Sequence, residues 1–551
     1  MRQISIILLL SSIYCLQSMG QTNDIVPTDG ITSALHKAHT GRITFMQGFI
    51  PLEKYMETDF LTNFELKPST DLNIRVFMDN SITNYLHVLA PALTPDVLIK
   101  KGNYQFSFYI DNNFIYKENL HYGAGLNKNT TTTFRVPLTT STGADWWGVH
   151  LWERFMLAGG EKALTNGTHQ LKIEIRPYLK MEENSEALVG NLIAHGELTL
   201  KIKPLLITAK QIAIQAIQPE RGWVISKARY NKRKIEELNK AIAQNTFKEI
   251  TSIVVIKEGK LLIEEYFNGA GRNTLHDTRS VGKSFSSALM GIAIKDGYIK
   301  DVDQSLHSFY NLHQYSNYSL EKDSITIKNL LTMSSAFNGS DQKDESPGNE
   351  ENMYPTNNWV KFTLDLPMDS SKSNGKQWDY FTAGVVLLGD ILHKSVPGGL
   401  EKYADKKLFQ PLGIKTYQWQ YTPQKVANTA GGLKMSSLSY AKVGELYKND
   451  GVWNGKQILP TKWIEETFTK HFQLPGSSNE FYGYLFWNKT YTVNGKKYEA
   501  FYCAGNGGSK IFIFKNIPVT IVITAKAYNR AYGHPQVDSI MSEYILPSII
   551  D

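Results

Sequence analysis

The chain has 551 residues, of which 42% are hydrophobic and 20% are charged. This composition is ordinary for a globular protein and excludes a disordered, collagen-like or low-complexity chain. The formal net charge of +7 is small for this length. The longest basic cluster, residues 227–234, fits the solvated face of a helix better than a nucleic-acid site, so we expect no nucleic-acid partner. Two cysteines, Cys15 and Cys503, are too few for a disulfide scaffold or a cysteine-based zinc site.

The first twenty residues have the pattern of a secretory signal peptide. Arg2 precedes an apolar stretch at 4–16, and the small-x-small triplet 18–20 follows it. This pattern predicts cleavage before Gln21, which would remove Cys15 and leave a single cysteine. No later run reaches 18 apolar residues, so we expect no stable membrane insertion and a periplasmic or secreted protein.

Residues 21–205 are expected to form a β-sandwich accessory domain. Segments 103–110, 170–175 and 197–202 alternate polar and apolar residues, which is typical of strands with one buried face. We predict an all-β sandwich with a role in positioning, substrate selection or dimer contacts, and a homodimer is left open. The tryptophan-rich stretch 145–152 is either part of the core or an aromatic platform for a sugar.

After a linker at 206–219, residues 220–551 combine helical and strand-like patterns of apolar residues. Apolar residues at helical spacing predict a helix over 228–245, and two apolar runs at 250–256 and 261–267 predict a hairpin. A further amphipathic helix is expected over 535–546. The mixture indicates an α+β domain with one antiparallel sheet flanked by helices.

This domain has few of the sequence motifs that mark known catalytic sites. It has no G-x-S-x-G elbow, no H-E-x-x-H zinc motif, no P-loop and no G-x-G-x-x-G, so we expect neither a metal nor a cofactor. It does contain S-x-x-K, in which a lysine one helical turn after a serine eases deprotonation of its hydroxyl. The pattern occurs five times, at Ser280, Ser319, Ser340, Ser373 and Ser439.

Context favours the first of these serines. Ser280 follows the predicted hairpin and opens a helix whose apolar stripe ends at the glycine signal 295–297. Ser439 also opens a helical run, but few residues follow it. The other three lie in polar stretches typical of loops. A triad with His276 and Asp277 is disfavoured, because residues so close before the nucleophile are badly placed for that geometry.

Residues 276–285, His-Asp-Thr-Arg-Ser-Val-Gly-Lys-Ser-Phe, resemble the active-serine region of the serine β-lactamase-related family. That family includes class C β-lactamases, penicillin-binding-protein-like carboxypeptidases, family VIII esterases and 6-aminohexanoate-dimer hydrolases. Further similar segments follow in the family's order, at 325–335, 378–389, 430–436 and 503–508. The resemblance covers about 220–551 and implies a β-lactamase-like (DD-peptidase) fold.

The resemblance also implies roles for individual residues. Ser280 would be the acylated nucleophile, Lys283 its proton partner and Tyr380 the general base. Tyrosine ionises near pH 10, so it can serve as a base only beside a cation. The oxyanion hole would consist of the backbone N–H groups of Ser280 and Asn506, with Ser509 as the alternative to Asn506 if the alignment shifts by three residues.

Departures from the family pattern bear on the substrate. Thr382 replaces the family's asparagine, and Cys503 with Ala504 replaces Lys-Thr, while the glycines remain. Cys503 either lines the site or belongs to the core, and Lys510 is a candidate replacement for the missing cation. The predicted substrate-binding residues are Thr382, Cys503, Gly505, Gly507 and Trp378.

These departures place the chain nearest the esterase and 6-aminohexanoate-dimer hydrolase branches. The predicted function is an exported serine hydrolase that cleaves a small-molecule or peptide ester or amide through an acyl-enzyme. The alternatives are a catalytically weak or inactive binding or scaffold protein of penicillin-binding-protein type, and a D-amino-acid peptidase or β-lactamase.

Overall fold

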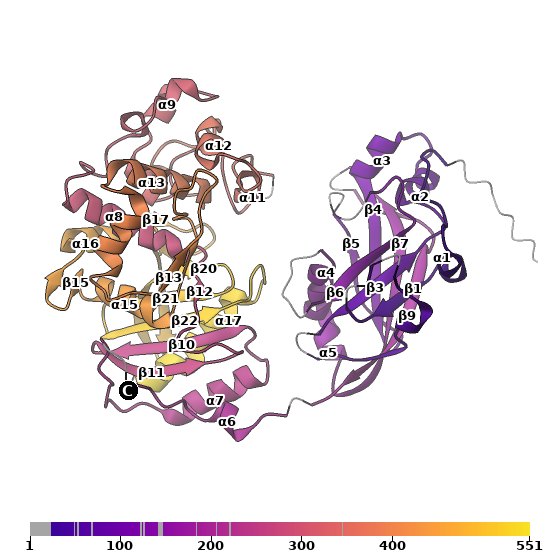
Figure 1. Cartoon of the computed structure of the whole chain (residues 1–551), viewed down its shortest axis with the longest axis horizontal. Helices are drawn as coiled ribbons and strands as arrows, with labels where there is room; N and C mark the ends of the chain where they lie inside the picture. The colour runs from indigo at the N-terminus through magenta and orange to yellow at the C-terminus, as the bar shows by residue number, and fades with distance from the viewer. Residues whose placement is uncertain are drawn as a thin grey trace, which may run out of the picture. The chain divides into compact units, whose positions relative to one another are not determined.

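The computed structural model describes residues 24–550 except 49, 52–53, 68–69, 122–123, 125–126, 141–146, 183–184, 205, 220–221 and 344. The predicted signal peptide and Cys15 lie outside the described residues. The chain forms two compact units that divide between Leu206 and Ile207 (Figure 1).

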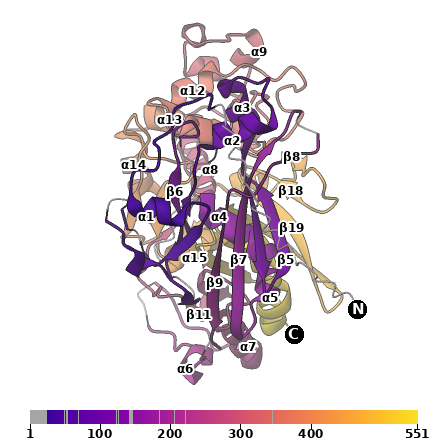
Figure 2. The same ribbon diagram turned by 90° about the vertical axis from the view of Figure 1, so that its right-hand side faces the viewer.

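Two sheets share one hydrophobic core in the first unit. The strands of the three-stranded sheet are, in order, β1 (Ile43–Met46), β3 (Leu72–Phe77) and β6 (Thr133–Thr139). The larger sheet runs β2 (Asn63–Glu65), β9 (Ala194–Ile202), β7 (Gly167–Leu179), β4 (Gly102–Ile110) and β5 (Asn113–Asn119), with β8 (Leu188–Val189) paired to β7. Figure 2 shows β9, β7 and β5 of this sheet facing the viewer. The three predicted strands are confirmed as parts of β4, β7 and β9.

Helices also belong to this unit, so the prediction of an all-β sandwich is not confirmed. They are α1 (Ala34–His39), η1 (Glu57–Asp59), α2 (Ile82–Leu89), α3 (Pro95–Lys101), α4 (Trp147–Phe155), η2 (Met156–Gly160) and α5 (Glu161–Ala163). In α4, Trp152 is buried against Phe108 and Phe155. Trp152 is therefore core rather than a sugar platform, and the partly buried Trp147 of the same helix packs against Phe106 and Phe134. Residues 145 and 146 lie outside the described residues.

An eight-stranded antiparallel sheet is the centre of the second unit. Its order is β11 (Lys260–Tyr266), β10 (Ile250–Lys257), β22 (Val519–Ala525), β21 (Ser509–Phe514), β20 (Lys496–Gly505), β19 (Trp487–Val493), β18 (Phe481–Tyr482) and β17 (Phe472–Gln473). The predicted hairpin is β10–β11. Its two turn residues, Glu258 and Gly259, both have positive φ, as a tight hairpin of this twist requires.

Helices cover both faces of this sheet. Helix α8 (Val281–Lys295) shares a core with one face, and α15 (Ser437–Lys448) and α13 (Thr382–Ser395) belong to the same core. The other face packs against α7 (Lys232–Ala243) and the C-terminal run α17 (Gly533–Ser539), η6 (Ile540–Ile545) and α18 (Leu546–Ile549). The predicted helices at 228–245 and 535–546 are thus present, and the antiparallel sheet flanked by helices is confirmed.

Shorter elements complete the second unit. They are α6 (Ala209–Ile212), β12 (His276–Asp277), η3 (Leu306–Ser308), η4 (Leu312–Gln314), α9 (Leu320–Asp323), α10 (Ile327–Leu331), α11 (Glu350–Met353), α12 (Trp359–Asp365), α14 (Gly399–Ala404), η5 (Asp405–Phe409), β13 (Tyr417–Trp419), β14 (Leu433–Met435), β15 (Val452–Trp453), β16 (Lys456–Gln457) and α16 (Thr461–Thr467). Strands β12, β14 and β13 form a small sheet beside the start of α8.

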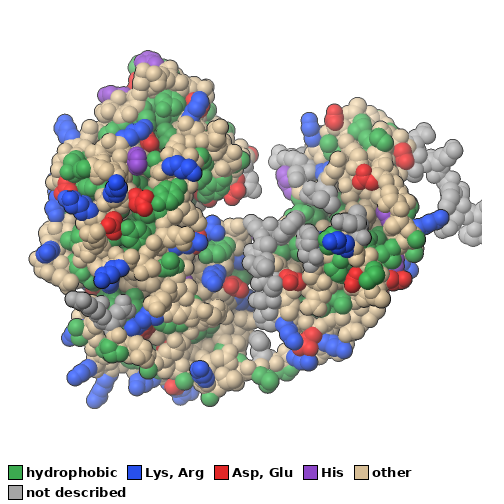
Figure 3. Space-filling model, in the orientation of Figure 1, with side chains coloured by type: hydrophobic (Ala, Val, Ile, Leu, Met, Phe, Trp, Pro, Cys, Tyr) green, Lys and Arg blue, Asp and Glu red, His purple; other side chains and the backbone are tan. Residues whose placement is uncertain are grey.

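Within the described part of the chain there is no membrane-spanning helix, and the face in view has no one-sided charge. Among the described residues, no helix combines the length and apolar character needed to cross a membrane. On the face of the molecule in Figure 3, Lys and Arg side chains are interspersed with Asp and Glu.

Candidate active site

Ser280 occupies the N-cap of α8, the buried helix that the sequence predicts. A backbone hydrogen bond from Thr278 to the carbonyl of Leu433 in β14 fixes the preceding segment. Arg279 then has φ +45°, a left-handed conformation that non-glycine residues rarely adopt. This sharp turn directs the chain into α8, and the helix N-terminus places its positive dipole end beside the serine.

Lys283 lies one turn later and completes the pair. Its Nζ donates to Ser280 Oγ over 2.8 Å and to the carbonyl oxygen of Ala430 over 2.7 Å. The side chain is only 2% exposed. Because a buried ammonium needs such partners, the ammonium is held against the serine hydroxyl. The Ala430 carbonyl is a contact that the sequence motif at 430–436 did not assign.

Tyr380 comes from the segment that precedes α13 and meets the same pair. Its ring centroid is 5.4 Å from Lys283 Nζ, and the Ser280 hydroxyl is a hydrogen-bond partner of its side chain. Burial raises the pKa of Tyr380 above its ordinary value, while the Lys283 ammonium and the Ser280 hydrogen bond oppose the rise. The three predicted catalytic residues are therefore brought together.

In two of the other S-x-x-K pairs, the lysine binds acceptors other than its serine. Lys322 directs its Nζ to the carbonyl oxygens of Ser316 and Leu364, and Ser319 caps the helix instead by accepting from the backbone of Lys322. In the competing pair, Lys442 Nζ donates to the carbonyl of Gly413, while Ser439 bonds Ser436. These contacts are structural.

The end of β20 lies directly against the nucleophile turn. A Cβ atom on Gly505 would sit 2.4 Å from the carbonyl oxygen of Thr278 and 3.4 Å from the backbone nitrogen of Ser280. Only glycine permits this approach. The next residue, Asn506, has its side-chain amide paired with Asn529. In the described part of the chain, the backbone N–H groups of Ser280 and Asn506 donate to no protein acceptor.

Cys503 is on the face of β20 that packs against α8. It is 2% exposed, and burial raises the pKa of its thiol to about 12. The thiol is therefore neutral and belongs to the core beside the site. Lys510 does not supply the missing cation at this position, because its Nζ donates to Asp538 in α17, on the other face of the sheet.

The remaining predicted binding residues are found at different depths. Thr382 begins α13 and is only 1% exposed. Trp378 is buried in an aromatic group whose neighbouring ring centroids are 5.0 to 6.3 Å apart; the group consists of Trp378, Tyr380, Tyr482 and Trp487. Gly507 has φ +95° and abuts the ring of Tyr528. Contact of these residues with substrate stays a prediction.

His276 is not part of this constellation. Its Nδ1 pairs with the hydroxyl of Thr251, and burial lowers the pKa of the ring to about 4. The neutral ring is a structural element of the sheet, as expected from its position.

Sequence reasoning missed Asp341, which contacts the backbone on both sides of Tyr380. Its N–H donates to the carbonyl oxygen of Tyr380 over 2.8 Å, and its Oδ2 accepts from the N–H of Thr382 over 2.7 Å. No local signal identifies it, because it lies in a polar loop without periodicity.

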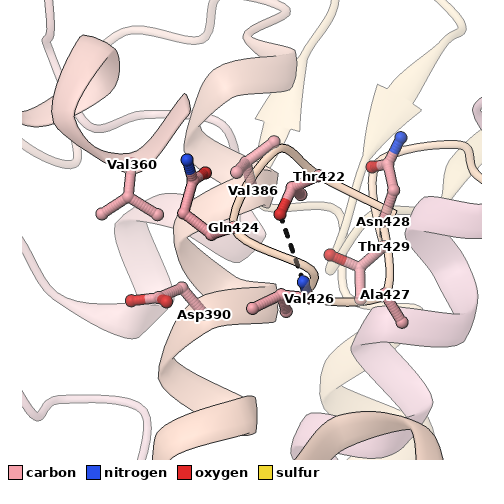
Figure 4. Close-up of a pocket in the computed structure, with 9 residues that line it drawn as sticks. All are labelled: Val360, Val386, Asp390, Thr422, Gln424, Val426, Ala427, Asn428 and Thr429. Carbon is pink, nitrogen blue, oxygen red and sulfur yellow. Dashed lines mark hydrogen bonds between the residues drawn. The ribbon is translucent and has the colours of Figure 1, made fainter. Parts of the chain in front are cut away.

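One small pocket lies between α12, α13 and the loop at 422–429 (Figure 4). It is lined by Val360, Val386, Asp390, Thr422, Gln424, Val426, Ala427, Asn428 and Thr429. No predicted site residue is among them, and the Asp390 carboxylate is already bound by the hydroxyl of Tyr310 at 2.7 Å. Among the described residues, no group of three or more His, Cys, Asp or Glu side chains is placed to hold a metal ion.

A family model for beta-lactamase matches residues 243–539, more than half of the chain. The chain belongs to the beta-lactamase family. Members of this fold family are serine hydrolases: esterases, amidases and β-lactamases. The resemblance drawn from the motifs is confirmed, and this protein is a serine hydrolase of that family. The first unit lies outside the match.

Solved structures similar to the chain include an octameric penicillin-binding protein homologue from Pyrococcus abyssi, with 18% identity, a TM-score of 0.43, and coverage of 56% of this chain and 76% of that one. EstCE1, a hydrolase with promiscuous acyltransferase activity, has 14% identity, a TM-score of 0.47, and coverage of 57% and 98%. A penicillin-binding protein homologue from Caulobacter crescentus has 15% identity, a TM-score of 0.45, and coverage of 60% and 98%. A comparison with curated protein sequences found no match.

Proposed function

We propose that this member of the beta-lactamase family is an exported hydrolase that cleaves a neutral ester or amide through an acyl-enzyme on Ser280. The observation that supports it most is the 2.8 Å hydrogen bond between Lys283 Nζ and Ser280 Oγ, with Tyr380 bonded to the same hydroxyl.

In the proposed reaction, Tyr380 accepts the proton of Ser280 Oγ while the Lys283 ammonium stabilises the phenolate character that this requires. Oγ attacks the carbonyl carbon, and the resulting oxyanion is bound by the N–H groups of Ser280 and Asn506. Tyr380 returns the proton to the leaving alcohol or amine as the bond to it breaks. Water then loses a proton to Tyr380 and attacks the acyl carbon. The bond between Oγ and the acyl carbon breaks, the acid leaves, and Tyr380 returns the proton to Ser280 Oγ, which restores both residues.

The proposed preference for a neutral substrate rests on the side chains at the end of β20. A neutral, buried Cys503 stands where the family resemblance implies a lysine, and Lys510 is paired with Asp538. Beside Ser280, the rings of Tyr380 and Trp487 stack with centroids 5.7 Å apart. Such a site favours apolar acyl groups over substrates with a carboxylate. We therefore expect short acyl esters to be hydrolysed faster than nitrocefin or D-alanyl peptides.

Labelling with a fluorophosphonate probe tests the enzyme proposal against the scaffold alternative. Intact mass should show one adduct on the wild-type chain and none on Ser280→Ala. An unlabelled wild-type chain, or equal labelling of both, would refute the acyl-enzyme. N-terminal sequencing of the exported protein tests the other element of the proposal, with Gln21 expected as the first residue.

A further inference from the structure

We propose that Asp341 is a positioning residue that holds the backbone of Tyr380 against Ser280 and, by its ionisation, makes turnover pH-dependent. This inference rests on the proposed function, because it assumes that Tyr380 is the base.

Asp341 fixes the backbone on both sides of Tyr380, the proposed base, and we call this arrangement the clamp. Asp341 N–H donates to the Tyr380 carbonyl, and Oδ2 accepts from the Thr382 N–H, so one residue holds the chain on both sides of Tyr380. Its other oxygen, Oδ1, accepts from the N–H of Glu350 over 2.9 Å. Thr382 and Glu350 are the first residues of α13 and α11, so one carboxylate caps two helix N-termini.

This clamp needs an ionised carboxylate. Both oxygens accept a backbone N–H, and a proton on either would remove one acceptor and release one helix end. Charged and titratable groups face Asp341 from each neighbouring element: Lys283 from α8, Glu350 from α11, Tyr354 after α11, and Tyr380 before α13. Asp341 is thus electrostatically coupled to the Lys283–Tyr380 pair as well as bonded to the backbone.

Burial, with the Glu350 carboxylate as the second cause, raises the pKa of Asp341 to about 6, and the Lys283 ammonium opposes the rise. As pH falls through this value, the carboxylate protonates and the clamp loses an acceptor. We therefore expect the pH profile of kcat to steepen below about pH 6.

Two variants test the proposal on the full chain with a short acyl ester. Asp341→Asn keeps one acceptor but loses the charge, and should lower kcat about 10- to 100-fold at pH 8 with little change in KM, because the base is misplaced rather than the substrate. It should also abolish the steepening near pH 6. Glu350→Gln keeps the backbone contact and removes a like charge, and should move the steepening to lower pH by about half a unit.

Glu351→Gln is the matched control, since it removes an exposed acid from the neighbouring position of the same helix and should leave the profile unchanged. A wild-type profile in Asp341→Asn, or an unshifted one in Glu350→Gln, would overturn the positioning role. If Asp341→Asn fails to fold, the Glu350→Gln shift decides alone. A wild-type chain that resists fluorophosphonate labelling would instead refute the proposed function itself.

Discussion

At the scale of single residues, burial and neighbouring groups have opposite effects on the ionisation of Tyr380. Burial raises the pKa of Tyr380, while Lys283 and Ser280 favour its ionised form. Lys283 itself is held by the Ser280 hydroxyl and the Ala430 carbonyl. Because its pKa is raised, Tyr380 holds its proton at neutral pH, and its phenolate binds a proton more strongly than an ordinary tyrosine does.

Tyr380→Phe removes the proposed base and leaves the ring. We expect kcat/KM to fall about 10²- to 10⁴-fold, the usual contribution of a positioned general base. Because burial raises the pKa of Tyr380 above its ordinary value, the wild-type rate should rise with pH between 7 and 9.5, and this slope should vanish in the variant. Steady-state kinetics check both, with circular dichroism as a control for folding. Near-normal turnover would contradict the assignment.

Gly505→Ala probes the close approach of β20 to the nucleophile. The added Cβ would lie 2.4 Å from the Thr278 carbonyl, so the turn that holds Ser280 must shift. A displacement of this kind should reduce kcat about 10²-fold. Gly271→Ala is the control, because its Cβ meets nothing within 4 Å. Equal activity of the two variants would show that Gly505 does not position Ser280.

At the scale of elements, alternation along the strands separates two faces of the sheet. Cys503 and Gly505 face α8, whereas Lys510 on the neighbouring strand faces α17. There Asp538 accepts from Lys510 at 2.8 Å and from Lys489 at 2.9 Å. Although burial acts in the opposite direction, the two lysines hold the pKa of Asp538 below its ordinary value. Its stabilising contribution should therefore persist at neutral pH and be lost only as the solution becomes acidic.

Asp538→Asn would leave two lysines without their shared carboxylate. Lys510 has a side chain only 3% exposed, so we expect about 3–5 kcal/mol of lost stability, as for a broken buried pair. Asp450→Asn breaks an exposed pair with Lys515 and should cost about 1 kcal/mol or less. Urea unfolding of both variants measures the difference. Equal destabilisation would show that burial does not govern this network.

At the scale of the whole molecule, each unit has a core of its own. The core of the first unit contains residues of both its sheets, and the cores of the second lie on the two faces of its eight-stranded sheet. Domains with separate cores commonly unfold as separate transitions.

Calorimetry should therefore resolve two unfolding transitions. The covalent phosphonate adduct on Ser280 should change the temperature of only one of them, because Ser280 belongs to the second unit. A single transition, or an equal change in both, would mean that the units unfold together. The Ser280→Ala chain treated with the same probe is the control and should keep both temperatures.

Local sequence pattern was sufficient for much of the fold. Period-two alternation identified β4, β7 and β9, and the apolar stripe after Ser280 identified α8, because these signals reflect one buried face of a single element. The same reasoning did not foresee the helices of the first unit. Three strong strands predict an all-β sandwich there, whereas short helices such as α2 and α3 have too few turns for a clear period.

The sequence by itself determined the family, the order of its motifs and the serine and lysine one helical turn apart. Only the tertiary structure decided that Lys283 contacts its serine while Lys322 and Lys442 bind other acceptors. It also decided that Cys503 is core, that Lys510 is paired elsewhere, and that Asp341 holds Tyr380. The physical reason is that spacing along a helix is a local property. The partner of a buried charge or thiol is instead set by strands and loops far apart in the chain, and only folding brings these together.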